Sequence, residues 1–251
     1  MNLLASEWIK ARSMRATWIV AVSAVVATVT VRLLGVSGLM PDWQTSLPVD
    51  FDPTGISFKG ILVGQILLAT LGSQTITNEY ATGQIVTSLS ITPRRTTLLA
   101  SKLAITLLIA TVTAVIAVAC SFVATQAALG AAGLPQATLA DPETVRAIAC
   151  AVAYLVLTAV LGLGFGVITR SSSGTLAIIV TVALLFPALA PGLPGPLGHL
   201  AGTYWPTTAG QSSYAVVAAS PFPPLFGLAI MAVFTLWTTL AARLVLKTRD
   251  A

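Results

Sequence analysis

Charged side chains are scarce in this sequence. Lysine, arginine, aspartate and glutamate make up 8% of its 251 residues, whereas hydrophobic residues make up 56%. The mean hydropathy is +0.91. A soluble domain carries about 25% charged residues, which keep its surface wet. A chain with a third of that share cannot cover itself with polar surface, so the composition excludes an ordinary soluble protein and indicates an integral membrane protein.

Residues that usually carry chemistry are also few. Cys120 and Cys150 lie in apolar runs without a CxxC or metal-binding spacing, and the single histidine, His199, cannot form a metal site alone. None of the lysines follows a glycine, so the G-K-[ST] of a Walker A loop is absent. HExxH and G-x-S-x-G are absent as well. We therefore expect no catalytic, metal or cofactor site on this chain, and any energy for transport must come from another chain.

Long uncharged runs are what the sequence does have. Each of six runs is long enough to cross a ~30 Å hydrocarbon core as an α-helix, and none shows the alternating polarity of a barrel strand. The runs are residues 16–36, 60–78, 103–126, 147–169, 174–191 and 224–242. The predicted fold is all-α, a single polytopic membrane domain over residues 1–251 with six transmembrane helices.

The charges outside these runs give an orientation. Six spans place both termini on one side of the membrane. With the termini inside, the cytoplasmic basic residues are Lys10, Arg12, Arg15, Arg94, Arg95, Lys102, Arg170, Arg243, Lys247 and Arg249, and the outer acidic residues are Asp42, Asp50, Asp52, Asp141 and Glu143. This bias follows the positive-inside rule and predicts a multi-pass protein of the cytoplasmic membrane with both termini cytoplasmic. It also accounts for the net charge of +5 without a nucleic-acid partner.

Two further segments are expected to lie at the membrane surfaces. Residues 1–15 place Leu3, Leu4 and Trp8 on one helical face and their charged residues off it, which predicts an interfacial amphipathic helix, with a frayed terminus as the alternative. Residues 191–221 are uncharged apart from His199 but rich in proline and glycine. We expect short re-entrant helices there, in the outer half of the membrane and packed against protein.

Arg32 is the one charge inside a predicted span. It lies fourteen residues past Trp18, so about 20 Å along a helix from the inner interface. We interpret it as an interface anchor whose side chain extends towards the outer head groups. The alternative is an arginine that lines a cavity.

One polar segment, residues 79–102, separates the second and third spans on the inner side. Ile85, Val86 and Leu89 could form the apolar stripe of a short helix that Pro93 would end. Such a helix under the bundle would be a docking surface for a cytosolic partner. From the residues alone, a solvated loop with basic anchors stays equally open.

Three motifs resemble those of type-2 ABC exporter permeases, bacterial and especially actinobacterial. The opening "EWIKARSMRATW" resembles the family's approach to its first span. The polar segment resembles "E-Y-x-x-G-x-I … P-R-R … L-x-A-K", with Ser101 before Lys102 as a minor departure. "YWPTTAGQSS" resembles the "L-P-x-x-A-G-Q" that precedes the last span. The resemblance covers the whole chain in order.

This resemblance implies a permease that pairs, as homodimer or heterodimer, with two cytosolic ABC ATPase subunits, which would bind ATP and Mg²⁺. The implied ATPase-coupling residues are Glu79, Tyr80, Gly83, Ile85, Leu89, Arg94 and Arg95, and the implied outer re-entrant gate comprises Pro206, Ala209, Gly210 and Gln211. The complex would export a hydrophobic or amphipathic substrate, such as a drug or a lipid, by alternating access. A secondary transporter, disfavoured by spans without acidic residues, and a non-transporting immunity or scaffold component are the alternatives.

Overall fold

The computed structural model describes residues 3–91, 95–217 and 221–248, and every regular element in these ranges is a helix, which confirms the all-α class. In chain order the elements are α1 (Leu3–Ser13), α2 (Arg15–Thr45), α3 (Pro53–Phe58), α4 (Ile61–Ala81), α5 (Gln84–Ile91), α6 (Arg95–Ala131), α7 (Pro142–Thr169), α8 (Ser172–Val180), a π-helical turn (Thr181–Leu185), α9 (Phe186–Leu189), a 3₁₀ turn (Ala190–Gly192), α10 (Pro196–Tyr204), α11 (Pro206–Ser212) and α12 (Pro224–Thr248).

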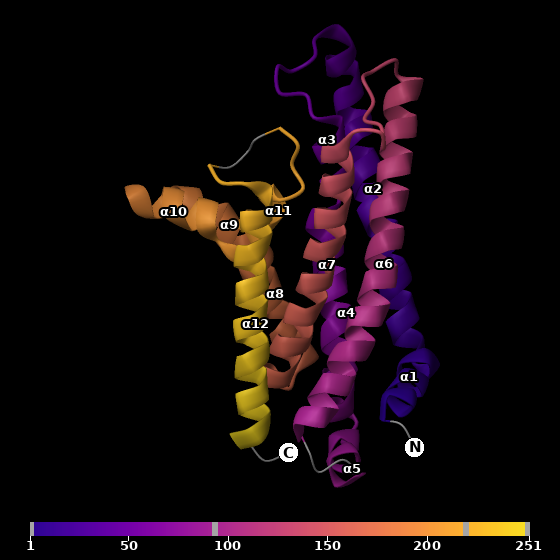
Figure 1. Ribbon diagram of the computed structural model, residues 1–251, viewed down its shortest axis with the longest axis vertical. Helices are drawn as coiled ribbons and strands as arrows, with labels where there is room; N and C mark the ends of the chain where they lie inside the picture. The colour runs from indigo at the N-terminus through magenta and orange to yellow at the C-terminus, as the bar shows by residue number, and fades with distance from the viewer. Residues whose placement is uncertain (1–2, 92–94, 218–220, 249–251) are drawn as a thin grey trace.

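The long helices run side by side along one axis (Figure 1). Helices α1 and α5 and the last turns of α12 lie at one end, which we call the α5 end. Helix α3 and the connections beside it lie at the opposite end, the α3 end. The first and last described helices therefore end on the same side of the bundle.

Five helical segments of the described chain are long and apolar enough to cross a membrane. They are Arg15–Thr45, Arg95–Ala131, Pro142–Thr169, Ser172–Gly192 and Pro224–Thr248. Helix α4 has the length of a span at 21 residues but is not among the five. Polar residues such as Gln65 and Gln74 lower its hydropathy, so the second predicted span, residues 60–78, is confirmed as a helix and its crossing of the membrane stays a prediction.

Helix α4 occupies the middle of the bundle and packs most extensively against α7. Glycines let the two backbones meet: a methyl group at Gly72 would overlap the carbonyl of Ala159, and one at Gly162 would overlap the carbonyl of Ala69. Small residues thus allow α4 and α7 to pack closely. The core around this contact includes the buried rings of Phe58 and Tyr154.

The predicted spans are too short at several ends. The first was expected to end at residue 36, but α2 continues to Thr45. The third was expected to begin at residue 103, but α6 begins at Arg95, so the second half of the predicted 79–102 loop is helix. Charge marks where a chain leaves the hydrocarbon, but a helix satisfies its own backbone hydrogen bonds in water as well and continues past that point.

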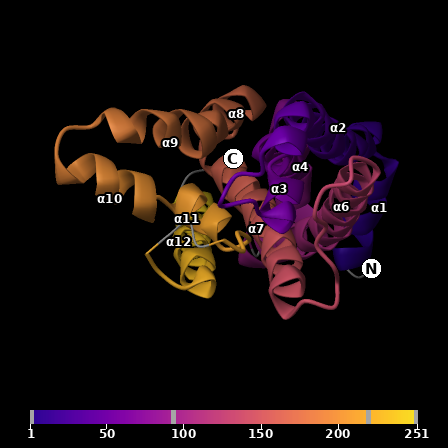
Figure 2. The ribbon, with the colours of Figure 1, turned by 90° about the horizontal axis from the view of Figure 1, so that it is seen from above.

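The two surface segments form the expected short helices with unexpected contacts. Helix α1 buries Glu7 and Ala11, whereas Leu4 and Ile9 are exposed, so Glu7, one of the charged residues placed off the apolar face, lies against the bundle. Residues 191–221 contain α10 and α11, and α9 and α10 extend sideways away from the bundle (Figure 2). The depth of these helices in a membrane stays a prediction.

Candidate functional site

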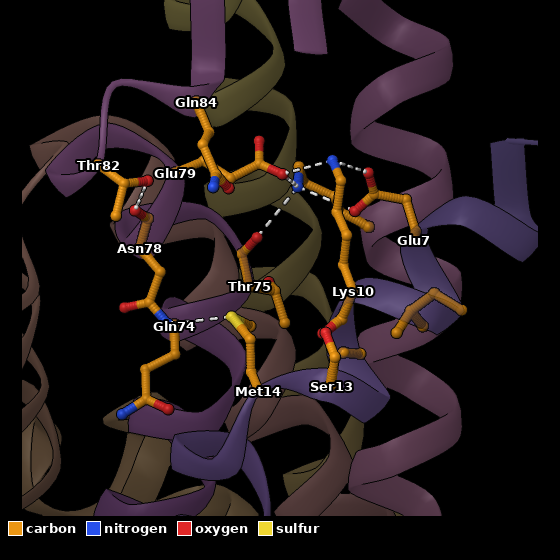
Figure 3. A pocket seen from close by; sticks show the side chains of 13 residues that line it. Glu7, Lys10, Ser13, Met14, Gln74, Thr75, Asn78, Glu79, Thr82 and Gln84 are labelled. Atoms are coloured by element: carbon orange, nitrogen blue, oxygen red, sulfur yellow. Dashed lines mark hydrogen bonds and ion pairs between the residues drawn. The ribbon is translucent and has the colours of Figure 1, made fainter. Parts of the chain in front are cut away.

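Four charged side chains from three helices meet at the α5 end. Lys10 Nζ lies 2.9 Å from Glu7 Oε1 and 2.9 Å from Glu79 Oε1. Lys102 Nζ lies 3.0 Å from Glu7 Oε2 and 2.8 Å from Glu79 Oε1. Each lysine thus pairs with both glutamates, in a cycle that joins α1, α4 and α6 (Figure 3). We call these four residues the ion-pair cluster.

Most of the cluster is buried. The exposed fractions of the side chains are 6% for Glu7, 7% for Glu79 and 1% for Lys102. Charges this deep are tolerated only when they are paired and hydrogen-bonded, and removal of one partner is strongly destabilising. Lys102 also donates to the carbonyl of Thr75, and Lys10 donates to Ser88 Oγ of α5. The cluster therefore binds four helices to one another at the end of the bundle.

The cluster shifts the pKa of two of its members, Glu79 and Lys10. Burial alone would raise the pKa of the Glu79 carboxyl, but Lys102 and Lys10 together hold this pKa below its ordinary value. Burial would likewise lower the pKa of Lys10, but hydrogen bonds and charge from Glu7 and Glu79 hold it above its ordinary value. Both side chains are therefore charged at neutral pH.

A pocket of about 270 Å³ opens beside the cluster, between α1 and the last turns of α4. All four cluster residues line it, and Figure 3 shows polar side chains such as Gln74 and Asn78 along one wall. The side chain of Lys10 is 41% exposed. The cluster therefore lies under the protein surface but within reach of the medium at the α5 end.

The predicted coupling residues occupy different environments. The sequence analysis placed Glu79 among the residues that would contact the ATPase subunits. In this structure Glu79 is buried, so its side chain cannot touch a partner directly. Tyr80 lies beneath the guanidinium of Arg170, 5.3 Å from the ring centroid to Cζ. Gly83 has a φ of +69° and lets the chain turn from α4 into α5, where Ile85 is buried.

The other predicted coupling residues lie towards the start of α6. Arg95 donates from Nη1 to the carbonyl of Leu246, 2.6 Å away, and so joins α6 to the end of α12. Leu89 belongs to α5, whose predicted existence as a short helix is confirmed. Pro93 and Arg94 lie outside the described residues, and the effect expected of this proline is untested.

Sequence reasoning missed the other three members of the ion-pair cluster as a site. Lys10 and Lys102 were assigned to the positive inner face, and Glu7 to the polar side of the first helix. One signal could have found them. Apart from Asp250, the acidic residues of the predicted inner segments are Glu7 and Glu79, so these two are the natural partners of buried lysines. Lys102 lies within α6 because this helix begins at Arg95 and not at residue 103 as expected.

The predicted gate residues form and anchor α11. Pro206 is its first residue, and Ala209 is fully buried. Gly210 lies against the ring of Tyr154, where an added methyl group would overlap it. Gln211 donates from Nε2 to the hydroxyl of Tyr154, 3.2 Å away, and Tyr154 donates in turn to Gln65 Oε1 of α4. A buried polar network thus links α11 to the centre of the bundle.

The chain after α11 is held by two charged residues of the α3 end. Arg146 of α7 donates to the carbonyls of Ser213 and Ala215, at 2.6 and 3.0 Å. Asp52 caps α3 through Oδ1 and accepts the backbone N–H groups of Val216 and Val217 on Oδ2, at 3.0 and 3.3 Å. These charge-assisted hydrogen bonds fix residues 213–217 to the bundle.

A larger pocket, of about 950 Å³, lies at this end between α11 and the α2–α3 region. Its lining combines aromatic and aliphatic side chains, such as Trp43, Phe51 and Leu62, with Asp50 and Lys59. Gln211 of the polar network is also part of its wall. The pocket can therefore contact both the apolar and the polar parts of an amphipathic molecule.

Arg32 does not fit the interface-anchor interpretation. Only 3% of the residue is exposed, and its Nε and Nη2 atoms are buried without a protein acceptor. It lies against Gly60, where the chain passes from α3 into α4. This burial favours the alternative role inside the protein, which stays a prediction.

Other candidate chemistry is sparse in the described ranges. They contain no group of three histidine, cysteine, aspartate or glutamate residues that could hold a metal ion. Cys120 is exposed and Cys150 buried, each as a free thiol. Ser171 caps α8 by accepting the N–H of Gly174, and Ser172, Ser173 and Gly174 form the first turn of that helix.

Comparison with known proteins places these features in a family. Residues 3–188 match the model of the ABC-2 family transporter proteins. The matched range contains the whole ion-pair cluster and ends shortly before α10 and α11. No curated protein sequence matches the chain.

Proposed function

Because the chain belongs to the ABC-2 family of transporter membrane proteins, we propose that it is the permease subunit of an ATP-driven exporter. The observation that carries this proposal is the ion-pair cluster. It joins the N-terminal helix, the short α5 and the ends of two long helices into one unit at one end of the bundle. A partner that binds α1 and α5 and changes shape with nucleotide would move α4 and α6 with them.

The same proposal assigns sides and partners. The α5 end is the cytoplasmic one, since its exposed charges, such as Arg12, Arg15 and Arg243, are basic. Two ATPase subunits bind there with ATP and Mg²⁺, and a second permease, a copy or a paralogue, completes the complex. The α3 end faces outward, and α4 is the sixth span, because about 31 Å of helix suffices to cross the hydrocarbon core.

Helix α4 offers a route between the two ends. It carries Glu79 at the inner end and Gln65 about 21 Å further along, where the polar network reaches Tyr154 and Gln211. Its glycine contacts with α7 are too close for the two helices to slide independently. Movement of the cluster would thus reach α11 as a shift of packed helices, as alternating access requires.

The substrate we propose is hydrophobic or amphipathic. The α3-end pocket supports this class, since its wall is largely apolar and its charged residues lie among aromatic rings. Whether the cargo is a drug, a lipid or another amphiphile is for transport assays to decide.

Isolation of the tagged chain from its native membranes in mild detergent, with mass spectrometry of what co-purifies, tests the first step. We expect a stoichiometric subunit with a Walker A motif. A single species in several detergents would contradict the exporter and favour a stand-alone membrane protein.

The coupling role of the cluster has its own test in the reconstituted complex. Glu79→Gln keeps the size of the side chain and removes its charge, so we expect the permease-dependent ATPase rate to fall by roughly fivefold to 100-fold, the range of typical coupling energies. Glu143→Gln, an acid at the opposite end, is the matched control and should leave the rate unchanged. An unchanged rate for correctly inserted Glu79→Gln would remove the coupling role.

A further inference from the structure

The carbonyl of Val182 has lost its helical donors. Residues 181–185 form a π-helical turn, in which the N–H of Phe186 bonds to the carbonyl of Thr181 instead of that of Val182. In a π-helical turn the donor to Val182 O would be the N–H of residue 187, but residue 187 is a proline and has no N–H. The turn lies within the candidate span Ser172–Gly192, where an unpaired carbonyl is costly.

Two side chains from the segment around α11 satisfy this carbonyl. Trp205 donates from Nε1 to Val182 O at 2.7 Å, and Thr207 donates from Oγ1 to the same atom at 3.2 Å. The Trp205 ring also stacks on Phe186, with centroids 3.6 Å apart. Thr207 is almost fully buried. The residues at the start of α11 are therefore docked onto the defect in the preceding span.

We propose that Val182, Trp205 and Thr207 form the releasable latch of the outer gate, with the π-helical turn as its hinge. The latch consists of neutral hydrogen bonds and one ring stack. The other end of the segment is held to Arg146 and Asp52 by charge-assisted bonds, which are roughly twice as strong. A force on the segment therefore opens the Val182 contacts first, while residues 213–217 stay attached to the bundle.

The position of α11 connects the latch with access to the α3-end pocket. Thr208 and Gln211 line the α3-end pocket and follow directly after the latch residues. Release at Val182 would let the start of α11 move away from the pocket wall and widen its mouth. The inference rests on the proposed function for the outward direction of opening, whereas the contacts themselves do not depend on it.

Cysteine accessibility tests the latch without any ATPase. In a background with Cys120→Ser and Cys150→Ser, Thr208→Cys reports on the pocket through its rate of modification by a membrane-impermeant maleimide in proteoliposomes. Thr207→Val removes the hydroxyl donor at nearly constant shape, and we expect the rate to rise about fivefold, the effect of one neutral hydrogen bond. Thr248→Val is the matched control, because the hydroxyl of Thr248 donates to the carbonyl of Leu244 in its own helix, is exposed, and lies in the last turn of α12, away from the latch and its hinge.

Pro187→Ala supplies a second prediction, with an expected outcome that misfolding would not produce. It offers Val182 a backbone N–H in place of the side-chain donors, so added to Thr207→Val it should reduce the effect of losing that hydroxyl. A rate unchanged by Thr207→Val, or raised equally by Thr248→Val, would overturn the latch. If no ATPase co-purifies but the labelling rates behave as expected, the latch is supported and the exporter proposal is contradicted. A labelling rate that rises with ATP only in the complex supports both the latch and the exporter.

Discussion

At the scale of single residues, the buried charged side chains of this protein are more informative than the exposed ones. Arg12, Arg15, Arg243 and Lys247 are exposed at the α5 end, as expected of the inner face that we propose there, and carry little specific information. Glu79 and Lys102 differ because they are buried and pair with one another and with neighbouring members of the cluster. A position that the sequence marked as a contact for a partner is, in the structure, the centre of the internal connection between helices.

The pH dependence of stability follows from this burial. The pKa of Glu79 is below its ordinary 4.5, so its stabilisation is fully present above pH 4.5 and is lost as the pH falls through the lower folded-state value. The pKa of Lys10 is above its ordinary 10.5, so its contribution is present below 10.5 and is lost only at higher pH. The cluster is therefore intact across the neutral range.

Thermal unfolding in detergent, followed from roughly pH 3 to 8, measures the acid side of this dependence. We expect Glu79→Gln to lower stability at neutral pH by on the order of 3 kcal/mol and to flatten the acid fall. Glu143→Gln, which removes an exposed carboxylate paired with its i,i+3 neighbour Arg146, should change stability by less than about 1 kcal/mol. An acid fall of the same size in wild type and Glu79→Gln would contradict the assignment to this carboxyl.

At the scale of elements, close approach of backbones is what holds α4 in the bundle. Gly162→Ala places a methyl group on the carbonyl of Ala69, an atom that cannot turn away, and should cost about 1–3 kcal/mol or more. Gly38→Ala is the matched control on α2, where the added methyl group meets nothing and helix propensity improves by up to about 1 kcal/mol. Melting temperatures of the two variants should therefore move in opposite directions; equal shifts would show that the α4–α7 contact is looser than the structure has it.

Elements also show what the sequence could predict. Composition and uncharged length predicted the helical class, five confirmed membrane-capable helices and the short helix α5, because the absence of water in the bilayer leaves few alternatives. Helix ends were missed, as at Arg95, because water permits a helix to continue. The ion-pair cluster and the docking of Trp205 on Val182 were missed because they join residues that are distant in sequence, for which composition and local pattern carry no signal.

At the scale of the whole molecule, the positions of the chain ends indicate whether the number of membrane crossings is odd or even. Five spans would put the start of α2 and the end of α12 on opposite sides, yet both lie at the α5 end (Figure 1). An even number of crossings would fit this arrangement, and we propose that α4, which runs between the α3 and α5 ends, supplies the sixth. Its polar residues face protein rather than lipid: Gln65, Ser73 and Thr77 are all buried. A helix shielded by its neighbours can cross with a lower hydropathy than one that meets lipid, which is why a hydropathy criterion passes over it.

Single cysteines on either side of α4 decide whether it crosses. Val49, in the connection after α2, is fully exposed, and Thr82, just after α4, is exposed too. In the background with Cys120→Ser and Cys150→Ser, we expect an impermeant thiol reagent to label Val49→Cys in intact cells and Thr82→Cys only after permeabilisation. Leu139→Cys, in the connection between α6 and α7, is the control for the outer face and should behave like Val49→Cys. Labelling of both flanking positions from the same side would keep α4 within one half of the membrane, and the ion-pair cluster could then not transmit a cytosolic movement to α11 along this helix.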